Sequence, residues 1–435
     1  MSSPSLPLPG SPSSTPSPES ASTTSDASAS ADSTPVDGAP LGDEESAPRH
    51  RQRLILGILA ALVLALAGVA VLVSRSESKP PPKPDIPLDA WAPYWALDAS
   101  LAEFDERSGS MRDVSPFWFN AVGVDEIVID PHASEDLTEE FMAKARRSKA
   151  NVVPSIVDAM AAGEMAEILA DPETRGQHVD AIVRFASDGD YDGIDIDYEQ
   201  FAFADGHSTW AETRPNWVAF IEELAEGLHG DGRTLTVSIP PVYDAERTSE
   251  SGFWVYDYGA IVDHVDRIRI MAYDFSVAEP GPIAPLNWVE TAIEGAIEAT
   301  GSPEKLVLGL PAYGRNWPTF VAGDCPAEGT PGRTSVSARS VDELIERRDA
   351  QPIRVDSTGE WMFEYELEVT DGTTTCVQTR QVHYVDGDGI RLRMDLAREY
   401  QLDGVALWAL GFDDDAIWVE ILPTVADPLV STVPR

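Results

Sequence analysis

Basic residues are scarce in this chain. Its 435 residues include 31 lysines and arginines against 74 aspartates and glutamates, which gives a formal net charge of -43 at pH 7. The lysines are limited to Lys79, Lys83, Lys144, Lys149 and Lys305. Because phosphate backbones are bound by basic surfaces, we expect no nucleic-acid partner. Plain solubility or a salty habitat explains the acidity better than attraction to a cationic glycan or avoidance of anionic wall polymers, so no substrate is inferred from it.

Long apolar runs are also scarce, with one exception. Residues 54–73 form an uncharged stretch of twenty residues, the length of a helix that spans about 30 Å of hydrocarbon. We predict a transmembrane helix here, between a disordered Ser/Pro-rich tail over residues 1–53 and a Pro-rich linker over residues 74–88. A cleaved signal peptide is the alternative, although its apolar region would be shorter, about 7 to 15 residues. Gly68-Val69-Ala70 leaves cleavage possible.

Cysteine is nearly absent. Only Cys325 and Cys376 are present, and their spacing fits no metal-ligand pattern. We expect no metal and no cofactor. Both cysteines follow the predicted membrane segment, where a disulfide between them is chemically permitted, and two separate thiols are the alternative.

The remaining residues, about 89–431, predict one large α/β domain. Short runs rich in Val, Ile and aromatic residues alternate with longer amphipathic stretches, which is typical of βα units around a parallel sheet. The strand candidates number eight and lie at 90–97, 116–122 with the nearby run 126–129, 151–157, 193–198, 234–239, 267–273, 305–311 and 404–410. Helices are expected at 137–148, 176–187, 215–230, 288–299 and 394–400. This order predicts a TIM-type (β/α)8 barrel, whose active site lies at the carboxyl ends of the strands.

The connection between the seventh and eighth predicted strands is too long for an ordinary loop. Residues 316–388 contain strand-like runs at 361–369 and 376–384 and a helical run at 341–348. We predict an inserted α+β subdomain. It forms either one wall of a substrate groove or a structural embellishment, and the sequence does not separate the two.

Acidic residues recur at the end of the fourth predicted strand, Asp192-Gly-Ile-Asp195-Ile-Asp197-Tyr-Glu199. Alternate residues of a strand share a face, so Asp195, Asp197 and Glu199 project together. Carboxylates this close raise one another's pKa and retain a proton that a general acid can use. A metal-binding or solvated strand end is the alternative, which the intervening isoleucines and the lack of nearby His or Cys disfavour.

This segment matches the D-x-x-D-x-D-x-E signature of family 18 glycoside hydrolases, the chitinase-like enzymes. Two further segments are similar to motifs of the same family, Met271-Ala-Tyr273-Asp274 and Gly309-Leu-Pro-Ala-Tyr313-Gly314-Arg315. The resemblance covers about residues 91–418. The Tyr-Gly-Arg segment followed by an insertion most resembles the branch of bacterial spore-germination and cell-wall glycosidases.

The resemblance implies a role for each matched residue. Glu199 would protonate the glycosidic oxygen, while the substrate's own 2-acetamido group attacks the anomeric carbon. Asp197 would orient that acetamide and stabilise the positive charge that develops on it, and Asp195 would share a proton with Asp197. Tyr273 would hydrogen-bond the acetamide oxygen. Asp274 and Met271 would lie beside it, and Trp408 would form the apolar floor.

Other residues are weaker candidates. Asp192 is expected to be structural, because its spacing separates it from the face of the three acids. Tyr313 and Arg315 suit either sugar contact or barrel packing. Among the aromatic residues at the ends of the first two strands, Tyr94 and Trp118 are candidate sugar-stacking walls, although such residues more often belong to the core.

Three functions follow from this reading. The first is a retaining, substrate-assisted glycosidase that acts on a polysaccharide containing N-acetylglucosamine, with chitin and peptidoglycan both possible. The second is a non-catalytic lectin-like barrel, and the third is an inert anchored scaffold; the acid at position 199 argues against both. Because such a substrate lies outside the cell, we predict a single-pass cell-membrane protein with a cytoplasmic N-terminus and an extracellular catalytic domain, or a secreted form if the apolar segment is cleaved. No oligomeric state is predicted.

Overall fold

The computed structural model describes residues 85–242, 252–329 and 331–426. The predicted tail, the predicted membrane segment and most of the predicted linker lie outside these ranges. Within them, no helix has the length and apolar character needed to cross a membrane.

Eight parallel strands form a closed barrel. The strands follow the order β1, β15, β9, β8, β7, β6, β5 and β2, and β2 pairs with β1 to complete the circle. Their bounds are β1 Leu88–Pro93, β2 Asp113–Ala121, β5 Ser155–Asp158, β6 Gly193–Asp197, β7 Thr234–Ile239, β8 Arg267–Ile270, β9 Leu306–Pro311 and β15 Gly404–Trp408. Nearly every residue of these strands is buried, as expected where helices cover the outside. The predicted TIM-type barrel is therefore confirmed.

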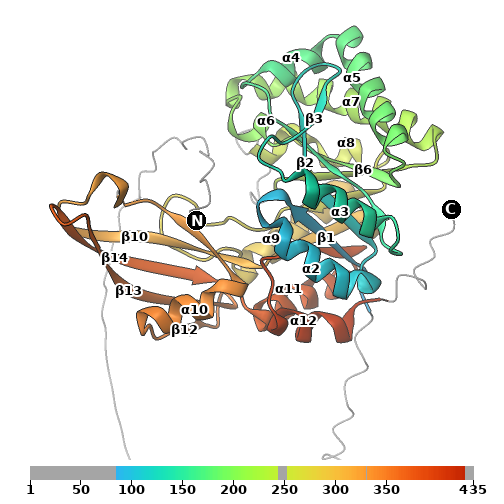
Figure 1. Cartoon of the computed structure of the whole chain (residues 1–435). Coiled ribbons are helices and arrows are strands. Elements are labelled where there is room, and N and C mark those ends of the chain that lie inside the picture. Colours follow the sequence, from blue (N-terminus) through green and yellow to red (C-terminus); the bar gives the residue numbers. More distant parts are fainter. Residues whose placement is uncertain (1–84, 243–251, 330, 427–435) are drawn as a thin grey trace, which may run out of the picture. The chain divides into compact units, whose positions relative to one another are not determined.

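Helices surround the barrel (Figure 1). The longer ones are α2 Leu97–Arg107, α3 Glu135–Ala145, α4 Glu164–Ala170, α5 Pro172–Asp188, α7 Trp210–Gly230, α9 Leu286–Thr300, α11 Gly387–Glu399 and α12 Asp415–Ile421. Two single-turn helices, α6 Gln200–Phe203 and α8 Tyr258–Ile261, lie in loops. Short 3-10 turns occupy Tyr94–Ala96, Ser108–Ser110, His207–Thr209, Gly252–Tyr256, Pro303–Lys305, Ala327–Gly329 and Leu422–Thr424.

Several element boundaries differ from the sequence-based ones for local reasons. The third strand is split into β4 Asn151–Val152 and β5, because Pro154 between them has no N–H for the ladder. The run near residue 127 is a separate antiparallel strand, β3 Ile127–Ile129. Helix α11 begins seven residues earlier than Met394, because the Asp386 side chain caps it by accepting a hydrogen bond from the backbone N–H of Gly389. Strand β1 ends at Pro93, so Tyr94 lies in a 3-10 turn.

The insertion between β9 and β15 is an antiparallel sheet with one helix. Strands β11 Thr334–Ser337, β10 Tyr313–Gly323, β14 Thr375–Tyr384, β13 Glu360–Thr370 and β12 Ile353–Val355 pair in this order. Helix α10 Ala338–Arg348 packs through Val341 and Leu344 on a small core of its own, and Figure 1 shows these elements grouped apart from the barrel strands. The insertion starts at Tyr313, three residues earlier than expected, so the Tyr-Gly-Arg segment belongs to its first strand.

Candidate active site

Asp195 of β6 lies inside the barrel and is fully buried. Its Oδ2 accepts hydrogen bonds from Trp91 Nε1 at 3.1 Å, Ser155 Oγ at 2.6 Å and Arg269 Nη1 at 3.0 Å. Its Oδ1 accepts one from Ser238 Oγ at 2.7 Å. Four donors from four other strands therefore fix the orientation of the Asp195 carboxyl group.

Asp197, two residues further along β6, lacks the hydrogen bonds that Asp195 receives. Its side chain is 3% exposed, and its Oδ1 is buried without a hydrogen-bond partner. Burial and the neighbouring charges of Glu199 and Asp195 raise its pKa well above the ordinary value, and Arg269 opposes them only in part. The raised pKa favours the protonated form of Asp197.

Glu199 follows the end of β6 and begins the short helix α6. The next residue, Gln200, fixes this turn by donating from Nε2 to the carbonyl oxygens of Asp158 at 3.0 Å and Met160 at 2.7 Å. Burial and the charge of Asp274 raise the pKa of Glu199 to about 7. Glu199 is half-buried. Its raised pKa makes a proton available near neutral pH, as a general acid requires.

Tyr273 and Asp274 lie in the loop directly after β8. Burial, followed by the charges of Asp197 and Glu199, raises the pKa of Tyr273 well above its ordinary value, so its hydroxyl remains a donor. Asp274 has a left-handed backbone with φ of 61°. The Tyr313 hydroxyl donates to its Oδ1, and Arg315 binds both of its oxygens. Tyr313 and Arg315 of the insertion thus fix Asp274 from across the site.

Aromatic rings surround Trp408 at the end of β15. Its ring centroid lies 4.9 Å from that of Phe117, 5.6 Å from Trp91 and 6.1 Å from Trp95. Tyr273 stacks on it at 6.4 Å with an interplanar angle of 23°. Trp408 is itself half-buried, so one apolar floor lies beside the acids, the arrangement that binds the face of a sugar ring.

The remaining predicted residues lie in four different environments. Trp118 is 2% exposed and packs edge-to-face on Phe141 of α3, so it belongs to the outer core and not to a sugar-binding wall. Met271 is 8% exposed, at the base of the site. Tyr94 is half-buried in its 3-10 turn, with its ring edge-on to Trp95 at 4.9 Å. Asp192 accepts a hydrogen bond from the Val152 backbone N–H at 2.8 Å, which is a structural contact.

Several residues of the site were missed by the sequence reading. Arg269, Ser155 and Ser238 bind Asp195, and Phe117, which was not among the candidates, packs against Trp408. One signal could have found the first three: polar residues at alternate positions of otherwise apolar barrel strands point inward.

The arrangement suits acid-assisted cleavage next to an acetamido group. Glu199 supplies a proton, Asp197 and Tyr273 supply polar groups close to it, and Trp408 supplies an apolar platform. Among the described residues, no group of three or more His, Cys, Asp or Glu side chains is placed to hold a metal ion.

Curated relatives share this domain. The chain is 31% identical over 248 residues to a Bacillus subtilis (strain 168) protein named as a sporulation-specific glycosylase, YdhD, an alignment that covers 56% of this chain and 53% of that protein. It is 26% identical over 229 residues to the cortical fragment-lytic enzyme of the same organism, covering 51% of this chain and 49% of the relative. The chain therefore spans about half the length of these two relatives.

Solved structures share the fold. A chitinase from Chromobacterium violaceum ATCC 12472 matches with a TM-score of 0.65 and 23% identity over 80% of this chain and 100% of its own. The spore cortex-lytic enzyme SleL of Bacillus megaterium QM B1551 matches with a TM-score of 0.64 and 18% identity over 80% of this chain and 75% of its own. The family model named Glycosyl hydrolases family 18 matches residues 115–413, which contain every acid of the site. The chain therefore belongs to glycoside hydrolase family 18, as its motifs predicted.

Proposed function

We propose that this glycosidase hydrolyses β-1,4 bonds next to N-acetylglucosamine by substrate-assisted, retaining catalysis, and that its substrate is peptidoglycan or another envelope glycan. The observation that carries the proposal is the pair of carboxyl groups on one strand end, Asp197 and Glu199, each with a raised pKa. The raised pKa values favour the protonated form of both groups. Glu199 thus has the environment that a proton donor needs, and Asp197 lies beside it to hold the acetamide.

The steps follow from the positions of these groups. Glu199 donates its proton to the glycosidic oxygen as that bond breaks, and the acetamido carbonyl oxygen of the substrate bonds to the anomeric carbon. Asp197 accepts a hydrogen bond from the acetamide nitrogen, where positive charge grows, and the Tyr273 hydroxyl donates to the acetamide oxygen. Water then attacks the anomeric carbon, the bond from that carbon to the acetamido oxygen breaks, and the water gives a proton to Glu199. This restores the enzyme and retains the configuration.

Peptidoglycan is favoured over chitin by the names of the two relatives in Bacillus subtilis, which refer to sporulation and cortex lysis. Hydrolysis of chitin oligosaccharides is the alternative. A non-catalytic, lectin-like barrel is the second alternative, and the intact acid at position 199 argues against it.

We also propose that the apolar segment over residues 54–73 anchors the enzyme in the cell membrane, with the catalytic domain outside. The support is the length of that uncharged stretch and the extracellular position of the proposed substrate. A secreted form would arise if the segment were cleaved.

Product analysis tests the catalytic proposal. The full chain and its Glu199→Gln variant would be incubated with purified peptidoglycan and with chitin oligosaccharides, and the products separated by mass. Release of fragments with N-acetylglucosamine at the new reducing end from peptidoglycan, by the unmodified chain alone, supports the proposal. Cleavage of chitin oligosaccharides only would make the enzyme a chitinase, and binding without cleavage would make it a lectin.

A further inference from the structure

A cavity of about 720 Å³ lies in the insertion, between the inner face of its sheet and helix α10. It is on the face of β10 opposite to the one that carries Arg315, because consecutive residues of a strand point to opposite faces. Its wall contains four arginines and two glutamates. The residues used below are Asn316, Arg333, Arg348, Tyr365, Gln378 and Arg380.

Arg380 of β14 is the most buried charge in this wall, at 4% exposure. Its partners are all neutral: Nε donates to Asn316 Oδ1, Nη1 to Gln378 Oε1, and Nη2 to the carbonyl oxygens of Asn316 and Gly332. No carboxylate of the described residues forms an ion pair with it. A buried guanidinium is expected to have an anionic partner, so its positive charge is left uncompensated.

Arg333 and Arg348 also lack a carboxylate partner within ion-pair distance among the described residues. Arg333 donates from Nη1 to the carbonyl oxygen of Val277. The Arg348 guanidinium lies 5.3 Å from the centre of the Tyr365 ring, and its Nε is buried without a hydrogen-bond partner. Within the described part of the chain, neither forms an ion pair.

Other arginines of the same subdomain are paired. Arg339 binds Glu103, Arg347 binds Glu343, and Arg354 binds Asp386 and Asp388. Among the described residues, three arginines around one cavity thus form no ion pair, and they occur in a chain with more than twice as many acidic as basic residues.

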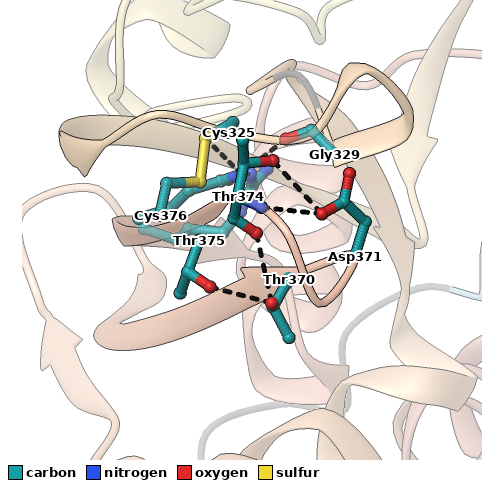
Figure 2. The surroundings of a disulfide bond; sticks show 9 residues. Cys325, Gly329, Thr370, Asp371, Thr374, Thr375 and Cys376 are labelled. Carbon is teal, nitrogen blue, oxygen red and sulfur yellow. Dashed lines mark hydrogen bonds between the residues drawn. A yellow bond between two sulfur atoms is a disulfide. The ribbon is translucent and has the colours of Figure 1, made fainter.

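One end of the cavity is closed by a loop that is covalently fastened. Figure 2 shows the disulfide between Cys325 and Cys376, with Gly329 close to it. Gln378 Nε2 donates to the Gly329 carbonyl oxygen at 3.0 Å. A Cβ at Gly329 would lie 2.2 Å from Val369 Cγ1, so the loop packs directly on β13 at this point. The cavity thus has a defined wall.

We propose that this cavity binds a carboxylate group carried by a sugar of the glycan substrate. Arginine forks match the two oxygens of a carboxylate, and three arginines that form no ion pair supply the charge. Arg333 also places the cavity beside the catalytic loop, because it binds Val277, three residues after Asp274.

This inference rests on the proposed function and narrows it. Chitin is a neutral polymer, whereas peptidoglycan carries carboxylates on muramic acid and on its peptides. A positively charged site can bind a carboxylate-bearing polymer, whereas chitin offers it no anionic group.

Binding of two matched sugars tests the inference separately from turnover. N-acetylmuramic acid is N-acetylglucosamine with a 3-O-lactyl ether group, which carries the carboxylate. Both sugars would be titrated by NMR into the full chain and into an Arg333→Gln/Arg348→Gln variant. We expect N-acetylmuramic acid to bind at least tenfold more tightly than N-acetylglucosamine, and the double variant to lose that preference. Arg391→Gln removes a positive charge from α11 that is paired with Asp388, Asp395 and Glu420, and it should leave the preference unchanged.

Equal affinity for the two sugars, or a preference that survives the double variant, would overturn the inference. So would binding of inorganic phosphate more tightly than N-acetylmuramic acid, because the site would then belong to a phosphate. If the double variant fails to fold by circular dichroism, the Arg348→Gln single variant provides the same comparison. Peptidoglycan cleavage without a carboxylate preference would leave the proposed function intact and remove only this inference.

Discussion

Arg269 Nη1 lies 3.0 Å from Asp195 Oδ2, and both side chains are completely buried inside the barrel. The same guanidinium reaches Asp89 Oδ2 at 3.4 Å, so one cation serves two carboxylates from β1 and β6. This pairing decides how charge is divided at the site. Asp195 is held in one orientation by this pair, and Asp197 beside it is the carboxyl group whose pKa is raised.

Replacing Arg269 with Met should leave Asp195 buried without its cation, whereas Asp89 keeps its closer partner Arg112 at 2.8 Å. Breaking a buried ion pair by removing one partner costs about 3 to 5 kcal/mol, so we expect a loss of this size in the free energy of unfolding, measured by urea denaturation. Arg269→Lys keeps the charge and should recover much of that stability. In the Lys variant kcat should still fall, since Asp195 loses the guanidinium geometry. Met and Lys variants of equal stability would contradict the assignment.

Glu199→Gln should reduce kcat by several orders of magnitude, because the amide cannot donate the proton that the leaving oxygen needs. Binding of substrate should be retained, since the amide has nearly the shape of the acid. Hydrolysis of a soluble N-acetylglucosamine oligosaccharide and its binding by calorimetry measure the two effects. Glu212→Gln, an exposed position in the first turn of α7, is the matched control. Turnover within tenfold of the unmodified enzyme would remove Glu199 from the role of general acid.

The pH dependence of kcat/KM should show an alkaline limb near pH 7, because burial and Asp274 raise the pKa of Glu199 to about 7 and only the protonated form donates. Asp274→Asn removes a like charge, so the pKa of Glu199 falls and the limb moves to lower pH. Arg315→Gln leaves Asp274 without its guanidinium partner, so the limb moves to higher pH. The position of the limb is the measurement, and a limb that stays fixed in both variants would contradict this electrostatic account.

Gly309 of β9 leaves room for the ring of Tyr273. A Cβ at this position would lie 2.8 Å from both Tyr273 Cε1 and the Ile270 carbonyl oxygen. Gly309→Ala should therefore displace Tyr273 and reduce kcat by about 100-fold, the cost of a misplacement of about 1 Å. Gly109→Ala, where a Cβ meets nothing within 4 Å, should leave activity unchanged. Equal activity in the two variants would show that Tyr273 tolerates displacement.

The disulfide between Cys325 and Cys376 spans 51 residues of sequence. Replacing both cysteines by serine should destabilise the protein by about 2 to 4 kcal/mol, because the unfolded chain regains the freedom of that loop. Thermal unfolding with and without dithiothreitol provides the measurement. Reductant should lower the melting temperature of the unmodified protein and leave the double variant unaffected. If the double variant had the same melting temperature as the oxidised protein, the disulfide would add no stability.

The sequence predicted what depends on periodicity and spacing. Buried apolar runs located the barrel strands, and alternation along β6 brought Asp195, Asp197 and Glu199 to one end of it. The choice of Trp118 failed, because Phe117 lies on the same face of β2 as Ser115, which binds Arg269 inside the barrel. The sequence alone did not show which of these two faces points inward. The partnership of Arg269 with Asp195 was also out of reach, since it depends on which strands face each other across the closed barrel.

The short passage from β9 to β10 has a mechanical consequence. β9 ends at Pro311 and β10 begins at Tyr313, and Tyr313 and Arg315 then bind Asp274 of the loop after β8. The insertion is thus fastened to the catalytic loop at the root of its first strand, so it cannot swing outward as a hinged lid without breaking those bonds. We therefore expect substrate to enter and leave the site without an outward movement of the insertion.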